Sequence, residues 1–234
     1  MQVIKDIMSG KTQAHLASLD NTCLIHAEAL KPFFVLQDAA AAKGFDLRIA
    51  SGFRSYERQL LIWNEKVSGK RALLDIFSQP LDQTGLSEIE RVFAILRWSA
   101  LPGCSRHHWG TDIDIWDAAA VPKDYRPELI VSEYELGGPF YELSKWLKSI
   151  SSDFHFSIPY STDTGGVARE PWHLSYAPVA KKFEDALDTK YVRSVLDLNR
   201  LLLGNTVLDH LDEIFFRFVL NKKVKKFKYE RISE

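Results

Sequence analysis

The chain has 234 residues, of which 46% are hydrophobic and 12% aromatic, which suffices for one sizeable core with an appendage rather than two full domains. Its 30 basic and 31 acidic residues nearly cancel, so the net charge gives no reason to expect a nucleic-acid partner. No apolar run approaches the roughly 20 residues of a membrane span, the first residues lack a signal-peptide pattern, and the only cysteines, Cys23 and Cys104, lie far apart, so we expect a cytoplasmic location.

The first half of the chain predicts helices around one strand. Residues 28–43 have a helical pattern, residues 45–50 alternate as a strand does, and residues 56–67 are again helical. The polar, glycine- and proline-containing residues 68–86 predict a loop. A capping box of Ser87 and Glu90 begins a helix that we expect to run to about residue 100.

The second half adds short strands and a helical end. We expect a strand at 109–116, a helix at 140–150, and two strands in 155–160 and 167–176, joined by a glycine-containing loop. From about residue 178 the pattern is helical, with Gly204 ending one helix and with Thr206 and Asp209 capping another; a basic tail follows at 222–228. Helices with antiparallel strands and no βαβ rhythm predict an α+β fold. We divide the chain into a domain of residues 1–180 and a helical extension of residues 181–234.

The stretch SRHHWGTDIDIW (105–116) concentrates ligating groups in a segment that otherwise looks like a buried strand. Asp112 and Asp114 share one face because residues two apart point the same way in a strand. His107 can return to that face if the chain turns at Gly110, and a catalytic zinc needs three protein ligands and an open position. His173 is the best candidate for the third ligand, with Glu170 as a nearby base. The alternative is a solvated loop with a salt-bridged strand end.

Three segments, in this order, resemble the LAS metallopeptidases, which include lysostaphin-type enzymes, D-Ala-D-Ala metallopeptidases and the hedgehog signalling domain. SGFRSYERQ (51–59) resembles the SGYRSxxxQ segment of the VanY-like and LdcB-like carboxypeptidases, SRHHWGTDID (105–114) their SxHxxGxAxD motif, and EPWH (170–173) their ExxH element. The likeness spans roughly residues 10–180. Asp112 departs from it, because the family usually has alanine there.

The resemblance implies a small antiparallel sheet with flanking helices and one zinc ion per chain, bound by His107, Asp114 and His173. Glu170 would take a proton from the attacking water and pass it to the leaving amine. The geometry raises a difficulty, because residues 170 and 173 would point to opposite sides of a regular strand. Pro171 predicts that Glu170 lies on a loop and His173 on the strand.

The expected substrate has a free terminal carboxylate. Arg54 can meet that carboxylate, or the oxyanion of the reaction, with fork geometry. Gln59 and Ser105 are further candidates for the same group, although each of the three has a plainer reading as a solvated or structural side chain. Cys104, close to His107 in sequence, suggests a cysteine nucleophile, but such Cys–His pairs are normally distant in sequence.

Two classes of function remain. The first is a zinc carboxypeptidase that removes terminal D-alanine from the stem peptides of muropeptides, with L,D-cleavage of tetrapeptides during cell-wall recycling as the main expectation. D,D-carboxypeptidase or D-Ala-D-Ala dipeptidase activity is the alternative within that class. The second class is a zinc-stabilised binding module without turnover, which would have no need of Glu170. Nothing in the sequence predicts the oligomeric state.

Overall fold

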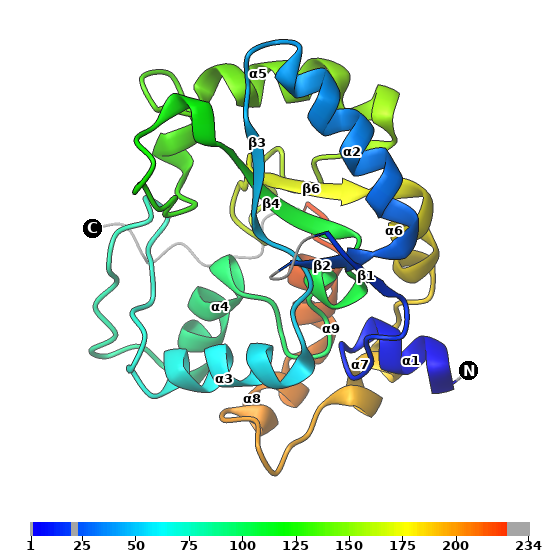
Figure 1. The fold of residues 1–234 in the computed structure, drawn as a ribbon. Helices are drawn as coiled ribbons and strands as arrows, with labels where there is room; N and C mark the ends of the chain where they lie inside the picture. The colour runs from blue at the N-terminus through cyan, green and yellow to red at the C-terminus, as the bar shows by residue number, and fades with distance from the viewer. Residues whose placement is uncertain (1, 20–22, 224–234) are drawn as a thin grey trace.

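The computed structural model describes residues 2–19 and 23–223, and a four-stranded antiparallel sheet lies at its centre (Figure 1). The sheet has the order β3–β4–β6–β5, and a separate hairpin pairs two short strands. The strands are β1 (Leu16–Ser18), β2 (Leu24–His26), β3 (Leu47–Ser51), β4 (Asp112–Asp117), β5 (Phe156–Ser157) and β6 (His173–Tyr176). The predicted α+β class is confirmed.

Helices contribute to two separate hydrophobic cores. One core joins the sheet to α2 (Ala27–Ala41) and α5 (Tyr141–Ile150). The other joins α3 (Tyr56–Val67) and α4 (Glu88–Trp98) to the C-terminal helices. The remaining helices are α1 (Gln2–Met8), α6 (Ala177–Asp185), α7 (Thr189–Val195), α8 (Gly204–Asp209) and α9 (Leu211–Ile214). The short helical turns are η1 (Arg106–Trp109), η2 (Ala118–Ala120), η3 (Val131–Tyr134), η4 (Ser151–Phe154) and the π-helical η5 (Phe215–Val219).

Strand β4 separates apolar from acidic side chains. Ile113 and Ile115 are buried in the core made with α2 and α5. Asp112 and Asp114 alternate with them and therefore lie on the other face. The register places Asp114 directly opposite His173, and Asp112 opposite Ser175. Strand pairing thus brings together residues about 60 positions apart in sequence.

The structure confirms several predicted boundaries and shortens others. The capping box forms, because Glu90 accepts a hydrogen bond from the Ser87 amide (2.8 Å) and Ser87 Oγ accepts one from the Glu90 amide (3.4 Å). The strand predicted from residue 109 begins only at Asp112, because η1 precedes it and ends at Gly110 with a φ of +68°. A Cβ at Gly110 would lie 2.8 Å from the backbone nitrogen of His26, and φ is positive, so glycine is favoured at this turn.

The C-terminal helices differ from the prediction. Gly204 begins α8 instead of ending a helix, because Leu203 adopts the left-handed conformation (φ +58°) and provides the turn. Thr206 and Asp209 lie within α8, so the prediction that they cap a helix is wrong. In the predicted strand 167–176, only His173–Tyr176 is a strand. Residues 224–228 of the basic tail lie outside the described residues.

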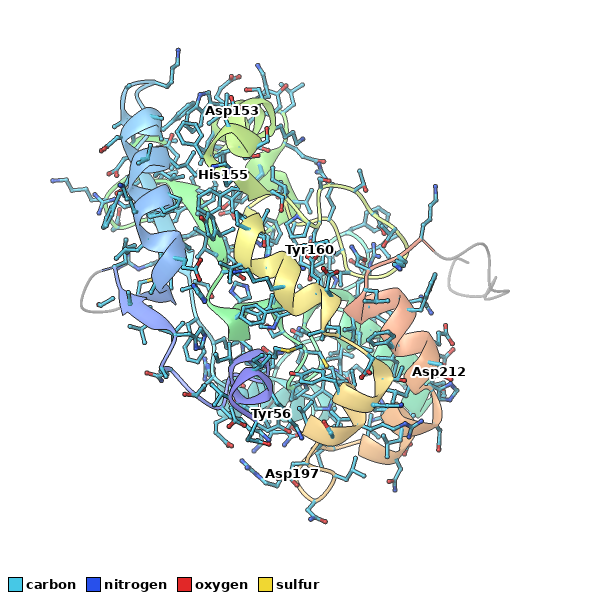
Figure 2. The ribbon with its side chains drawn as sticks, turned by 90° about the vertical axis from the view of Figure 1, so that its right-hand side faces the viewer. Tyr56, Asp153, His155, Tyr160, Asp197 and Asp212 are labelled. Atoms are coloured by element: carbon cyan, nitrogen blue, oxygen red, sulfur yellow. The ribbon has the colours of Figure 1, made fainter. Side chains whose placement is uncertain are left out.

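The segment after α7 packs on α3 through side chain to backbone hydrogen bonds. The Tyr56 hydroxyl accepts a hydrogen bond from the Asp197 amide (3.2 Å), and these residues lie together in Figure 2. Trp63 Nε1 donates to the carbonyl of Leu202 (2.9 Å). Within the described part of the chain, no helix combines the length and apolarity that a bilayer span requires.

Candidate active site

Three buried side chains converge at the centre of the sheet. His107 lies on η1, Asp114 on β4 and His173 at the first position of β6. Each offers one ligand atom, and these atoms lie within 4.8 Å of one another. His107 Nε2 is 3.3 Å from Asp114 Oδ2, and His173 Nδ1 is 3.1 Å from Asp114 Oδ1. The three predicted ligands are therefore brought together.

The second ring nitrogen of each histidine fixes which nitrogen faces the centre. His107 Nδ1 lies 3.0 Å from the Gly52 carbonyl, which can only accept, so Nδ1 carries the proton and Nε2 is left for the centre. His173 Nε2 lies 3.0 Å from the Asp112 carboxylate and donates to it, so Nδ1 is left for the centre. Both imidazoles are thus oriented by hydrogen bonds within the protein.

The donor set fits a zinc ion. Asp114 Oδ1 and His173 Nδ1 are buried and make no hydrogen bond, an expensive arrangement unless a cation completes it. Zinc prefers nitrogen and carboxylate ligands at about 2.0–2.1 Å, which places neighbouring ligands of a tetrahedron about 3.3 Å apart. The separations of the Asp114 carboxylate from His107 Nε2 (3.3 Å) and from His173 Nδ1 (3.1 Å) are close to that value. Three protein ligands leave one coordination position for water or substrate.

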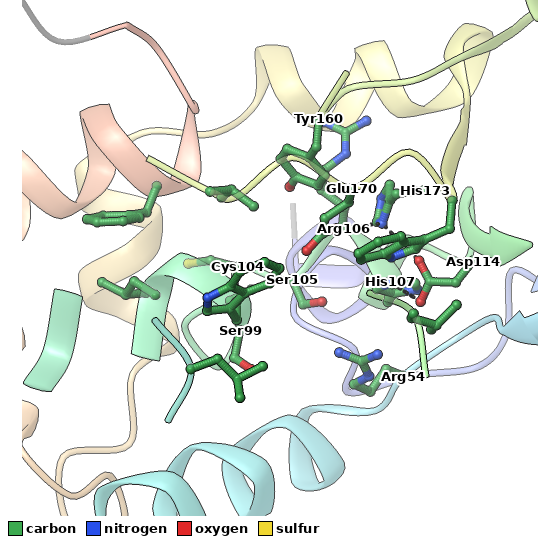
Figure 3. A pocket seen from close by; sticks show the side chains of 18 of the residues that line it. Arg54, Ser99, Cys104, Ser105, Arg106, His107, Asp114, Tyr160, Glu170 and His173 are labelled. Carbon is green, nitrogen blue, oxygen red and sulfur yellow. Dashed lines mark ion pairs between the residues drawn. The ribbon is translucent and has the colours of Figure 1, made fainter. Parts of the chain in front are cut away.

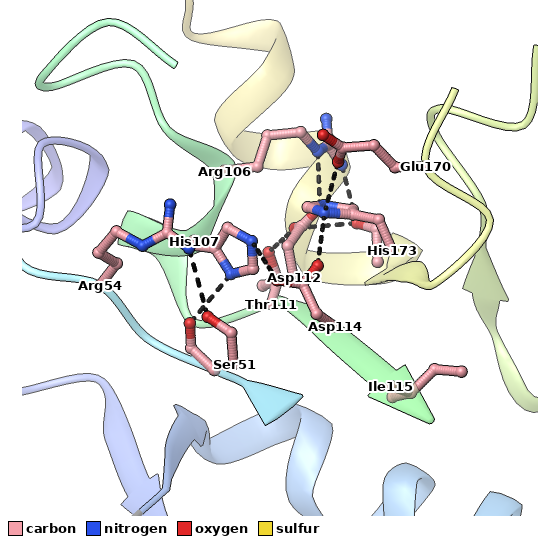
Figure 4. A network of polar contacts seen from close by, with 12 residues as sticks. Ser51, Arg54, Arg106, His107, Thr111, Asp112, Asp114, Ile115, Glu170 and His173 are labelled. Carbon is pink, nitrogen blue, oxygen red and sulfur yellow. Dashed lines mark hydrogen bonds and ion pairs between the residues drawn. The ribbon is translucent and has the colours of Figure 1, made fainter. Parts of the chain in front are cut away.

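Asp112 supports His173 from behind the metal ligands (Figure 4). Its carboxylate also accepts hydrogen bonds from Arg106 Nε (2.6 Å), Thr111 Oγ1 (2.6 Å) and Ser175 Oγ (3.0 Å). Burial raises the pKa of Asp112, but Arg106 and His173 outweigh it and hold that pKa well below its usual value. Asp112 therefore stays a carboxylate that orients His173, and Asp114 is left as the candidate metal ligand.

A turn before β6 brings Glu170 to the metal ligands. The Glu170 amide donates to the Tyr160 carbonyl (2.9 Å), and the His173 amide donates to the Glu170 carbonyl (3.1 Å). This turn places Glu170 Oε2 3.4 Å from His173 Nδ1, although the two residues are three apart. Glu170 thus precedes the strand and His173 begins it, as Pro171 predicted.

A cavity of about 230 Å³ opens at these residues (Figure 3). Arg54, Ser105, His107, Asp114, Glu170 and His173 all line it, together with residues that the sequence did not single out. Arg54 is held by neutral groups, because its guanidinium donates to Gln59 Oε1 (3.1 Å) and Ser51 Oγ (3.3 Å). Burial lowers the pKa of Arg54, which remains far above neutral pH as for any arginine.

Gln59 lies beneath Arg54 and not on the cavity wall. It is fully buried, its Oε1 accepts from Arg54, and its Nε2 donates to the Ala100 carbonyl (2.7 Å). Both ends of its amide are therefore engaged by the protein. In this arrangement Gln59 positions Arg54, whereas Ser105 reaches the cavity directly.

His108 fixes the backbone that carries Arg54. His108 Nδ1 donates to the Arg54 carbonyl (2.6 Å), and its Nε2 accepts from the Gly103 amide (3.1 Å). Burial lowers the pKa of His108 to about 3, so the ring stays neutral and keeps this donor–acceptor pattern. The Arg54 amide in turn donates to the His107 carbonyl (3.0 Å), which couples the arginine to a metal ligand.

Further wall residues come from segments that carry no motif. Tyr160 packs edge-on against the His173 ring with centroids 4.9 Å apart, and burial raises the pKa of its hydroxyl to about 12. Burial also raises the pKa of the Cys104 thiol to about 12, so the thiolate needed for a cysteine nucleophile does not form. Lys66 lies on the wall as well. Trp172 both packs against Tyr134 and lines the cavity.

Comparisons with known proteins agree with this geometry. The family described as VanY, D-alanyl-D-alanine carboxypeptidase, matches residues 22–179. A D-alanyl-D-alanine carboxypeptidase of Enterococcus faecalis is 30% identical over 147 residues, which are 62% of this chain and 45% of that protein. This chain thus spans less than half the length of that relative.

Two solved structures share the fold. VanYB in complex with D-alanine-D-alanine matches with a TM-score of 0.50 and 26% identity, covering 78% of this chain and 89% of that chain. The LdcB LD-carboxypeptidase matches with a TM-score of 0.52 and 23% identity, covering 84% and 90%. The family match covers more than half of the sequence and includes all three motifs. The chain therefore belongs to the VanY D-alanyl-D-alanine carboxypeptidase family.

Proposed function

We propose that this protein is an L,D-carboxypeptidase that removes the terminal D-alanine from tetrapeptide stems of muropeptides in the cytoplasm, during cell-wall recycling. The observation that carries its carboxypeptidase chemistry is the convergence of His107, Asp114 and His173 with a carboxylate, Glu170, at 3.4 Å from His173 Nδ1. A binding module without turnover would have no use for that carboxylate at the open side of the metal site.

Each residue has a role in peptide hydrolysis. His107, Asp114 and His173 would hold the zinc ion, which would act as a Lewis acid toward the scissile carbonyl and lower the pKa of a bound water toward ~7. Glu170 accepts the proton of the attacking water and returns it to the leaving amine. Arg54 binds the terminal carboxylate, because it is a half-buried guanidinium whose hydrogen-bonding partners, Gln59 and Ser51, are uncharged. This contact explains why a terminal residue would be the one removed.

The L,D preference rests on chemistry and location. Only two cysteines occur, far apart in sequence, which suits a reducing compartment. A D,D-carboxypeptidase in the cytoplasm would destroy the pentapeptide precursors that wall synthesis needs. L,D-cleavage would instead convert recycled tetrapeptides into reusable tripeptides. D,D-cleavage remains the second candidate, because VanYB, which shares the fold, binds D-alanine-D-alanine.

The test offers zinc-loaded protein a tetrapeptide and a pentapeptide side by side and measures the released D-alanine. We expect the tetrapeptide to be cleaved with the higher kcat/KM. Preferential cleavage of the pentapeptide would overturn the L,D assignment and leave the hydrolytic mechanism in place.

Glu170→Gln is the matched inactive control for this test. It should retain zinc and lose ~10²–10⁴-fold in kcat, since a general base contributes about that much. Turnover close to that of the wild type would remove Glu170 from the mechanism.

A further inference from the structure

Helix α3 places a lysine where its pattern calls for an apolar residue. Its buried face includes Gln59, Trp63 and Lys66, which lie at helical spacing. Lys66 is only 7% exposed and lines the same cavity as the metal ligands. Lysine is almost never buried to this extent without a partner.

The Lys66 ammonium group forms neither a hydrogen bond nor an ion pair with any of the described residues. Its neighbour Glu65 pairs with Arg71 instead (2.9 Å). Burial, helped by the charges of Arg71 and Arg54, lowers the pKa of Lys66 to about 8, while Glu170 opposes this shift. The amine therefore still carries its proton at neutral pH. Burial of this charged group makes the free energy of folding less favourable.

Three cationic side chains line the cavity: Arg106 is paired with Asp112 and Glu184, whereas Arg54 and Lys66 form no ion pair with any described residue. Arg54 is bonded through its backbone to His107 and is influenced by the charges of both Asp114 and Glu170, which places it at the metal end. Lys66 comes from the far end of α3 and is influenced by Glu170 alone among the acidic groups. The terminal carboxylate of the substrate binds Arg54 and is therefore not available to Lys66. The positive charge of Lys66 would be compensated by a second anionic group on the same substrate.

We propose that Lys66 binds a second substrate carboxylate, the one on the side chain of the residue that precedes the terminal D-alanine. This rests on the proposed function, since a tetrapeptide with meso-diaminopimelate before D-alanine carries one carboxylate at its end and one on that side chain. A tetrapeptide with lysine in place of diaminopimelate would instead present a side-chain ammonium group, which the Lys66 ammonium group would repel. The apolar wall residues Leu96 and Phe218 strengthen both effects by excluding water.

The test measures kcat/KM for D-alanine release from three tetrapeptides that differ only in the third residue. These residues are diaminopimelate with a free side-chain carboxylate, the same residue amidated, and L-lysine. The wild type should prefer the free carboxylate over the amide by roughly 10- to 100-fold, the usual worth of a charged hydrogen bond. Lys66→Met should lose that preference, so that its kcat/KM values for the free-carboxylate and the amidated peptide become similar. Lys70→Met, an exposed lysine beyond the same helix, should change nothing.

Two outcomes would overturn the inference while the proposed function stands. In the first, the wild type cleaves all three tetrapeptides equally well. In the second, Lys66→Met with normal zinc content loses activity on all three by the same factor, which would assign Lys66 to the terminal carboxylate. If the wild type releases no D-alanine from any tetrapeptide, both the proposed function and this inference are wrong.

Discussion

Asp112→Ala separates the role of a supporting carboxylate from that of a metal ligand. The substitution removes the acceptor of the His173 Nε2 proton and leaves Asp114, His107 and His173 in place. Zinc should still bind. Its affinity should fall by ~10–100-fold, which is the usual cost of losing such a partner and equals about 1.4–2.7 kcal/mol.

The same substitution also acts on stability through Arg106. That side chain is only 12% exposed and is paired with Asp112 and the more exposed Glu184. Removing one partner of a buried ion pair costs about 3–5 kcal/mol, a large part of the ~5–15 kcal/mol that holds a domain together. Adding Arg106→Met should recover much of that stability, because the only carboxylate that then loses its partner is the more exposed Glu184, but it should leave zinc affinity low.

Two measurements distinguish these effects. Competition with a chromophoric chelator gives the zinc affinity, and urea unfolding of the metal-free protein gives the stability. Zinc affinity equal to that of the wild type in Asp112→Ala would refute the orienting role of Asp112. Complete loss of zinc in Asp112→Ala, with retention in Asp114→Ala, would show that the two aspartates have been assigned the wrong way round.

Three further predictions follow from the site. His107→Ala and Asp114→Ala should each lose the bound zinc in metal analysis, and stoichiometric zinc in either would contradict the ligand set. Arg54→Lys should lower kcat/KM by roughly 10-fold or more, because an ammonium group replaces the forked guanidinium, which also contacts Gln59. An unchanged kcat/KM would exclude bidentate binding of the substrate carboxylate by Arg54. Lys66→Met should be more stable than the wild type by about 3 kcal/mol at pH 7, since the pKa falls from 10.5 to about 8 on folding. That difference should shrink between pH 8 and 10.5, where the unfolded chain still binds the proton that the folded protein has released. A destabilised Lys66→Met in urea unfolding at pH 7 would show that the lysine supports the fold.

The convergence of two of the three candidate metal ligands, His107 and Asp114, could be predicted because their geometry is local. Asp112 and Asp114 share a face by strand alternation, and Gly110 permits the turn that returns His107 to that face. The pairing with His173 is long-range, and it was the EPWH element, through its resemblance, that located this residue. The division of roles between the aspartates is now explained by the register, which sets Asp114 opposite His173.

Other features depend on tertiary contacts that no local pattern carries. The left-handed residue that precedes α8 is Leu203, and not the adjacent Gly204, so the glycine in the sequence pointed to the wrong position. Tyr160 reaches His173 only because the loop between β5 and β6 folds back over the site. The unusual position of Lys66 could be recognised in the sequence, because a lysine three residues after Trp63 interrupts the apolar face of α3. Such an interruption is the kind of local inconsistency that marks functional positions.

The C-terminal helices contribute to the active site although they lie beyond the family match, which ends at residue 179. Phe218 of η5 lines the cavity. Arg217 of the same turn donates to the Gly165 carbonyl (3.1 Å), and a Cβ at Gly166 would lie only 1.9 Å from the Arg217 carbonyl oxygen. The loop that leads to Glu170 is therefore pressed directly against η5. If Glu170 moves a proton as we propose, it must be held within a narrow range of positions, and the contact with η5 would then support its loop, while Phe218 of η5 forms part of the cavity wall.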